Sequence, residues 1–229
     1  MMKSFDRIEG HEWFHCKLFL ETEIEDDKYE IARDDSPAHY LLVNEVFRPV
    51  LKEFWDGLYL WRFHRQFRSW DEGMREEPPA KPIHQFKFKF YTTQACFVSI
   101  EKRLAKALKP LKKAKLILGY ETEKSPDSGA RIGSDRDTGW DYDIKVVWPY
   151  FIHGVSLAWY QLILAQIEHT EEGAFKEGWQ KESLERRLQV YRSVKKQLTT
   201  LWTREGNGPF LHHMNALFGY HKMWSRISP

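Results

Sequence analysis

The most constraining stretch of this chain is His-Gln-Phe-Lys-Phe-Lys-Phe at residues 84–90, where phenylalanine and lysine alternate from Phe86 to Phe90. Successive side chains of a β-strand point to opposite faces, so the three phenylalanines share one face and Lys87 and Lys89 share the other. A helix would spread the same residues around its circumference. The stretch therefore predicts a strand with a buried phenylalanine face and a polar lysine face.

A second stretch, residues 58–67, alternates in the same way, with Trp61 and Phe63 on one face and Arg62 and His64 on the other. Two interpretations of these basic side chains stay open. If the two strands are neighbours, their cations form one positively charged floor that suits carboxylates, because arginine can bind two acceptor oxygens at once. Otherwise they are charged residues that protect a sheet edge against aggregation.

Residue type predicts three more strands, at 13–21, 115–121 and 142–151, each rich in aromatic or β-branched residues. Helical spacing of apolar residues predicts five helices, which begin near Ser36, Thr93, Val155, Leu184 and Pro209. Pro49 lies within the apolar stripe of the first helix and should kink or divide it. Strands alternate with helices and no glycine-rich phosphate loop is present.

This order predicts an α+β protein with ferredoxin-like antiparallel or mixed sheets, flanked by helices and ending in a helical C-terminus. With 229 residues, the chain suits one domain over residues 1–229. Two packed α+β halves, 1–115 and 116–229, are the alternative division.

Charge and composition exclude several classes of function. The net charge of +2 does not indicate a nucleic-acid binder. Cys16 and Cys96 suggest no disulfide framework, so a reducing compartment is expected. The N-terminal residues lack the apolar region of a signal peptide, and no apolar stretch is long enough for a membrane span. We therefore expect a cytoplasmic protein without membrane contact.

Residues 11–15, His-Glu-Trp-Phe-His, match the zinc-protease pattern H-E-x-x-H. That pattern needs a helix, on which His11 and His15 would project to one side and reach one zinc ion. Here it leads directly into the strand predicted at 13–21, and on a strand positions four apart are about 13 Å from each other. We therefore expect no metal site, and no organic cofactor either.

The order of these motifs along the chain resembles that of the thiopeptide-type bacteriocin biosynthesis domain, the C-terminal elimination domain of lantibiotic dehydratases, which also occurs as stand-alone proteins. Six stretches carry the resemblance, in this order: WFHCKLFL, VFRPVLKEFW, LYLWRF, HQFKFKF, YFIHGVS and HHMNALFG. The chain departs from the family pattern where Lys87 and Lys89 replace arginines and where Ala216 stands in place of an arginine.

The resemblance implies tailoring of a ribosomally synthesised peptide without a cofactor. One branch of the family eliminates glutamate from glutamylated Ser or Thr to leave dehydroamino acids. A related branch joins two dehydroalanines by aza-cycloaddition into a pyridine. The implied partners are a precursor peptide and a dehydratase that glutamylates it, and a homodimer is left open. The alternative is a non-catalytic module that holds the peptide for a partner modification enzyme.

Elimination needs a base for a weakly acidic Cα hydrogen and cations for the developing enolate and the departing carboxylates. The resemblance places the base at His213, and alignment on Asn215 instead puts Leu211 at that position. His212 is the neighbouring candidate, and which imidazole faces the peptide stays open. Arg62 is the expected catalytic cation. The expected substrate-binding residues are Arg65, His64, His84, Lys87, Lys89, Ser156 and Asn215.

Overall fold

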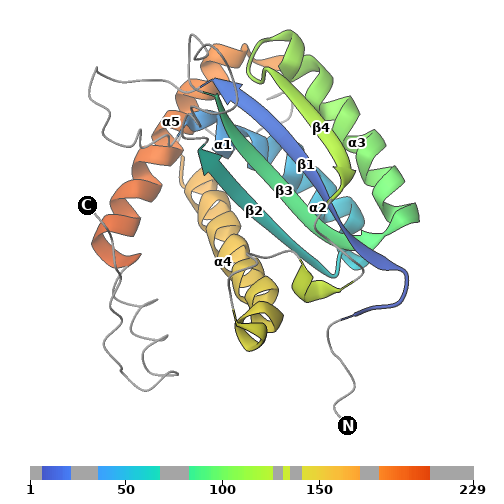
Figure 1. The fold of residues 1–229 in the computed structure, drawn as a ribbon. Helices are drawn as coiled ribbons and strands as arrows, with labels where there is room; N and C mark the ends of the chain where they lie inside the picture. The colour runs from blue at the N-terminus through green and yellow to red at the C-terminus, as the bar shows by residue number, and fades with distance from the viewer. Residues whose placement is uncertain are drawn as a thin grey trace, which may run out of the picture.

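The computed structural model describes residues 7–21, 36–67, 83–125, 131–134, 141–170 and 181–206. Four strands form one sheet in the order β2-β3-β1-β4, and every neighbouring pair is antiparallel (Figure 1). The strands are β1 (His11–Glu21), β2 (Leu60–Phe67), β3 (Ile83–Thr93) and β4 (Gly119–Lys124).

Helices connect the strands in the chain order of a ferredoxin-like unit, β1-helix-β2-β3-helix-β4, and this confirms the predicted α+β class. The first connection comprises α1 (Pro37–Leu41), the π-helical η1 (Leu42–Phe47) and α2 (Arg48–Phe54), and the second is α3 (Gln94–Lys113). Two long helices follow β4, namely α4 (Tyr142–Glu168) and α5 (Leu184–Leu201). Strands from both sides of residue 115 share this sheet, because β4 pairs with β1.

The alternating stretches form strands as predicted. Phe86, Phe88 and Phe90 of β3 are completely buried, and they contact one another, β1, β2 and the helices of the first connection. Figure 1 shows α1, α2 and α3 on the same side of the sheet. The phenylalanine face of β3 is therefore the floor of the hydrophobic core.

Pro49 divides the first helical run, as expected. Ser36 caps the run, since its hydroxyl accepts a hydrogen bond from the Ala38 amide. The stretch just before the proline is π-helical, and the Arg48 amide donates to the Val43 carbonyl five residues back. Proline has no amide hydrogen, and in a regular α-helix its ring clashes with the carbonyl four residues earlier. The wider π-helical turn just before Pro49 relieves this clash.

The strand predicted at residues 142–151 is wrong, because the whole stretch belongs to α4. Its aromatic and β-branched residues suggested a strand by residue type. The buried residues of α4 instead recur three, four or seven positions apart, which is helical spacing. The Asp141 side chain caps the helix by accepting from the Asp143 amide.

Helix α4 also covers the outer edge of β2, which would otherwise present unpaired backbone groups. The Ser156 hydroxyl accepts a hydrogen bond from the Phe63 amide at 3.1 Å. His153 Nδ1 lies 3.2 Å from the Trp61 amide nitrogen and 2.8 Å from the Trp61 carbonyl oxygen, so it can accept from one or donate to the other. None of the helices in the described ranges is both long and apolar enough to cross a membrane.

Candidate functional site

The face of the sheet turned away from the helices carries two rows of polar side chains, which we call the polar face. The strand register sets Arg62 opposite Lys89 and His64 opposite Lys87. The same register continues across β1, where His15 lies opposite Lys89 and Lys17 opposite Lys87. The predicted neighbourhood of the arginine-bearing and lysine-bearing strands is therefore present.

Glutamates of β4 complete the two rows, because Glu123 lies opposite His15 and Glu121 opposite Lys17. The rows thus run from cations on β2 and β3 to carboxylates on the far edge of the sheet. Exposure differs along them: His64 is exposed, Lys87 and Lys89 are half-buried, and Arg62 is buried. The accessible lysines of this face are therefore Lys87 and Lys89 on β3 and Lys17 on β1.

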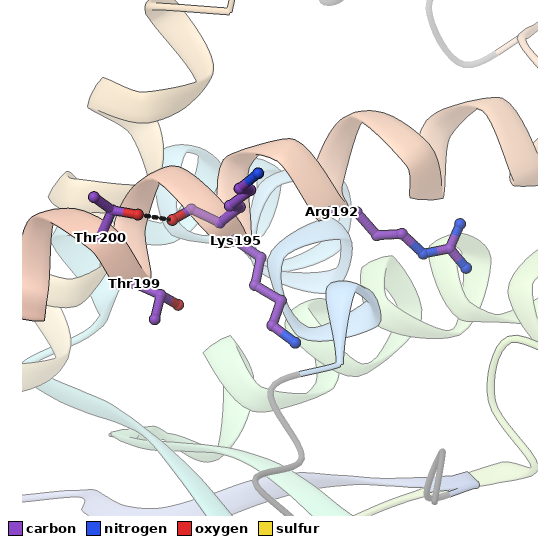
Figure 2. Close-up of a pocket in the computed structure, with 5 residues that line it drawn as sticks. Arg192, Lys195, Thr199 and Thr200 are labelled. Carbon is purple, nitrogen blue, oxygen red and sulfur yellow. Dashed lines mark hydrogen bonds between the residues drawn. The ribbon is translucent and has the colours of Figure 1, made fainter. Parts of the chain in front are cut away.

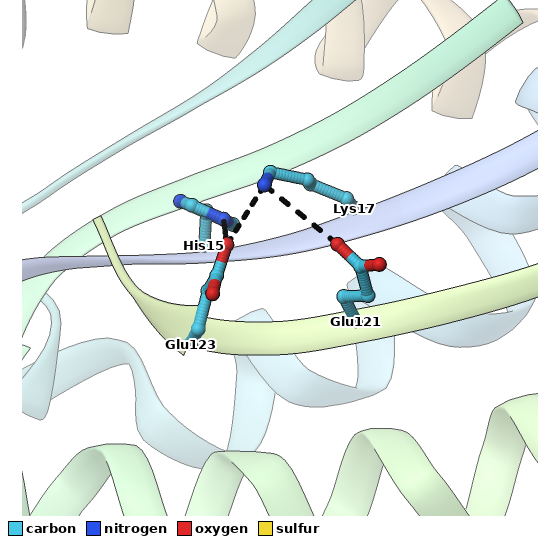
Figure 3. A network of polar contacts seen from close by, with 4 residues as sticks. All are labelled: His15, Lys17, Glu121 and Glu123. Atoms are coloured by element: carbon cyan, nitrogen blue, oxygen red, sulfur yellow. Dashed lines mark hydrogen bonds and ion pairs between the residues drawn. The ribbon is translucent and has the colours of Figure 1, made fainter. Parts of the chain in front are cut away.

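A polar network links β1 and β4 on this face (Figure 3). Lys17 Nζ lies 2.7 Å from Glu123 Oε1 and 3.7 Å from Glu121 Oε2. His15 Nε2 lies 3.0 Å from the same Glu123 oxygen. A carboxylate only accepts hydrogen bonds, so His15 Nε2 is the donor and the lone pair of the neutral ring is on Nδ1.

The network sets the charge states of its members. Burial lowers the pKa of His15, the Lys17 ammonium lowers it further, and the hydrogen bond to Glu123 acts in the opposite direction. Hydrogen bonds from Lys17 and then from His15 lower the pKa of Glu123. Near neutral pH the face therefore holds a neutral His15 imidazole oriented by a carboxylate, which is an arrangement typical of a base.

At one end of the polar face, a small apolar cluster replaces the charged rows. Trp13, Leu60 and Tyr91 pack there with Ile132 of the short 3-10 turn η3 (Ile132–Ser134). The Trp13 indole donates to the Ile132 carbonyl oxygen at 2.9 Å. The charged part of the face is therefore bounded by an apolar wall on this side.

Three of the residues expected to bind substrate do not lie on the polar face. Arg65 faces the helices, with its guanidinium 4.9 Å from the centre of the Trp159 ring. His84 is buried beside α1, and Ser156 is occupied with the Phe63 amide. Strand parity separates Arg65 and His84 from Arg62, His64 and the two lysines, and Ser156 belongs to α4 at the edge of β2, so the structure does not bring the two groups together.

His84 forms a buried pair with His39 of α1, a residue that the sequence did not single out. The two Nε2 atoms are 2.9 Å apart, so one ring donates and the other accepts. Burial lowers the pKa of His39 well below its usual value, and the charges of Arg65, His84 and Lys195 lower it further. This pair joins the first helix to β3 inside the core.

The remaining expected site residues, His212, His213 and Asn215, lie outside the described residues. His11 and His15 of the zinc-protease pattern are on strand β1, as predicted. No group of three or more His, Cys, Asp or Glu side chains that could hold a metal ion occurs in the described parts of the chain.

A separate basic pocket of about 370 Å³ lies along α5 (Figure 2). Its lining includes Arg192, Lys195 and Lys196, together with the neighbouring Thr199 and Thr200. The Thr200 hydroxyl donates to the Lys196 carbonyl oxygen at 2.9 Å. These cations extend from a single helix and are mostly exposed. The pocket therefore combines side chains from fewer elements of the fold than the polar face does.

His15 and Lys17 were not among the predicted site residues, although the sequence contains a pattern that indicates their position. Both alternate with the buried Phe14, Cys16 and Leu18 along β1, exactly as the lysines of β3 alternate with phenylalanines. Strand parity could therefore have placed them on a polar face. Their meeting with Glu121 and Glu123 depends on the pairing of β1 with β4, which parity does not give.

Comparisons with known proteins yield no relatives that assign a function. No family model and no curated protein matches the chain. Among solved structures, an amidase of the hydantoinase/carbamoylase family from Burkholderia multivorans matches with 12% identity and a TM-score of 0.28, over 50% of this chain and 27% of that one. A Burkholderia phymatum amidase of the same family matches with 12% identity and a TM-score of 0.31, over 60% and 38% of the two chains.

Proposed function

We propose that this protein binds an acidic, glutamylated segment of a ribosomally synthesised peptide on the polar face and takes part in tailoring that peptide by glutamate elimination. The observation that carries the proposal is the register that sets Arg62 beside Lys89 and His64 beside Lys87. Cations on adjacent strands are spaced about 5 Å apart, which suits the carboxylates of a glutamyl ester.

A bound peptide would add its own carboxylates to this face, where the described Glu121 and Glu123 lie on β4 at one edge of the sheet. Glu121 and Glu123 contact Lys17 of β1, on the β4 side of the sheet. A bound acidic group would therefore meet less repulsion over the cations of β2 and β3 than over the carboxylates of β4. Departing glutamate would be held there while a base removes the Cα hydrogen.

The base in this proposal is His213 or His212, as the family resemblance implies. Pyridine formation by aza-cycloaddition is the related reaction; it depends more on orienting two dehydroalanines than on a base. Both reactions require the same peptide to occupy the polar face.

A non-catalytic peptide-binding module is the second candidate, and one observation favours it. His15 is the imidazole that a carboxylate orients on this face, and its Nδ1 is buried. The polar face by itself thus offers cations for binding but shields its best-oriented base from a substrate.

The test is to incubate the protein with glutamylated and unmodified precursor peptides and to follow both binding and peptide mass. We expect tight binding of the glutamylated peptide and release of glutamate. The double variant Lys87→Gln/Lys89→Gln should weaken binding at least about tenfold, because two charge-assisted hydrogen bonds are lost. Lys109→Gln, an exposed lysine of α3, is the matched control and should bind normally.

The outcomes separate the candidates. Glutamate release that His213→Ala or His212→Ala abolishes without loss of binding supports elimination. Binding with unchanged peptide mass supports the module. Equal binding by the double variant and the wild type would remove the polar face from the proposal, and no binding of either peptide would end it.

A further inference from the structure

The N-terminal half of α4 exposes an apolar stripe. Ile144, Val147, Phe151 and Val155 are 52%, 55%, 44% and 46% exposed, which is high for large apolar side chains. Their spacing of three, four and four residues places them within roughly 80° of the helix circumference, along about 16 Å of its length. They form one continuous surface rather than scattered exposed residues.

The opposite face of the same helix is already in use. His153 and Ser156 bind the backbone of β2, and Tyr160 packs beside Trp61 in the core. A surface helix normally pairs one apolar face with a polar outer face. The only charged residues of α4 before Glu168 are Asp143 and Lys145. Helix α4 is thus apolar both on the face that packs against β2 and on its outer face, as is typical of a helix that packs against other segments on both faces.

Gly154 gives a second, independent indication. It lies in the interior of α4 beside the stripe, it is exposed, and a Cβ atom built on it would meet nothing within 4 Å. Glycine in a helix interior costs about 1 kcal/mol relative to alanine. No contact among the described residues requires the absence of a side chain here. A close approach by another helix does require it.

We propose that a second copy of this chain docks on this stripe, with the two α4 helices packed against each other about a twofold axis. A twofold contact joins the same patch on both copies, and an apolar stripe without charges is complementary to itself. The part-exposed side chain of Tyr150 widens it on one side. These five part-exposed side chains offer about 500 Å² per copy, or about 1,000 Å² in total, which is about the smallest area expected of a specific interface.

A membrane surface fits the stripe less well. Helices that lie on membranes carry lysines and arginines along their polar face. Helix α4 has one lysine and no arginine in its 27 residues. Dimerisation through α4 is independent of the peptide-tailoring proposal, which concerns the polar face of the sheet.

The experiment is sedimentation analysis of the full chain from about 1 to about 100 μM, where mass action separates a dimer from a monomer. We expect the wild type to sediment as a dimer. Phe151→Glu should raise the dimer dissociation constant at least about 100-fold, because two unpaired charges enter an apolar contact. Gln161→Glu adds the same charge at an exposed position of the same helix and should leave the dimer intact.

Gly154→Met keeps the test decisive if Phe151→Glu fails to fold. It removes no contact within the chain and adds bulk only on the outer side of α4, so a folded monomer is expected. A wild type that is monomeric throughout the range, or a Phe151→Glu variant and a Gly154→Met variant that both remain dimeric, overturns the proposal. A monomeric wild type that becomes dimeric when cut after Gly206 would show that its own C-terminal segment occupies the stripe, and this also overturns it.

Discussion

Strand parity decides, residue by residue, which polar side chains can meet. Arg62 and Arg65 are three positions apart on β2, so the first faces the polar face and the second faces Trp159. His84 and Lys87 of β3 are separated in the same way. An odd separation on a strand therefore assigns one basic residue to the polar face and the other to the face covered by helices, where it needs a partner.

Burial makes the contribution of His39 to stability depend on pH. Burial holds His39 neutral in the folded state, whereas in the unfolded chain it titrates near about 6.5. As the pH falls below that value, the unfolded chain takes up a proton that the folded chain does not. Stability is therefore present above about pH 6.5 and falls with decreasing pH, by about 1.4 kcal/mol per pH unit for each such proton.

We predict that His39→Gln flattens this dependence. Urea unfolding at about pH 7.5, 6.5 and 5.5 measures how the free energy of unfolding depends on pH. These pH values span the range in which an unperturbed histidine titrates. The variant should lose the part of the pH dependence that His39 contributes. The part that His15 contributes should remain, because burial also lowers the pKa of His15. His169→Gln, at an exposed position, is the control. An unchanged slope in His39→Gln would contradict the assignment.

Between elements, a buried polar network fastens α5 to the first helical run. The Tyr191 hydroxyl donates to Glu45 Oε1 at 3.0 Å and accepts from Asn44 Nδ2 at 2.9 Å. Arg187 forms an ion pair with the other Glu45 oxygen. One phenol thus satisfies an acceptor and a donor that have little access to water.

Removing that hydroxyl should cost more than one hydrogen bond. Tyr191→Phe leaves buried polar groups of Asn44 and Glu45 without this partner, so we expect a loss of about 1–3 kcal/mol in the free energy of unfolding. Urea denaturation measures it. Tyr142→Phe removes a hydroxyl from an exposed ring and should change stability by less than about 0.5 kcal/mol. Equal effects of the two changes would show that the network contributes nothing.

Across the whole molecule, the ferredoxin-like unit and the two later helices share one core. Tyr160 and Ile163 of α4 and Val194 of α5 belong to the same buried cluster as the phenylalanines of β3. Helix α4 covers the edge of β2, and α5 packs on α1 and α4. We therefore expect that the sheet and its two connections do not form a self-sufficient domain.

A chain ending at Ser125 should consequently fail to fold stably. It would expose the buried surface under α4 and α5 and leave the Phe63 amide without its partner. We expect a loss of cooperative thermal unfolding and binding of a hydrophobic dye, measured by circular dichroism and fluorescence. Adding residues 141–206 as a separate peptide should restore cooperativity. Cooperative unfolding of the short chain alone would contradict a shared core.

The sequence by itself determined most strands, their faces and the α+β class, because alternation with period two and helical spacing are local properties. It failed at residues 142–151, where residue type favoured a strand and the buried spacing of α4 is helical. Other local features, such as the division of the first helix at Pro49, also followed from residue chemistry alone.

Only the tertiary structure decided which side chains meet. Pairing of β3 with both β2 and β1 set Lys89 between Arg62 and His15, and β4 supplied Glu123. The packing of α4 against β2 brings Ser156 to the edge of the strand, where it accepts a hydrogen bond from the Phe63 amide, and leaves Phe151 exposed. Register and packing partners depend on contacts between segments far apart in the chain, and no local pattern of residues encodes them.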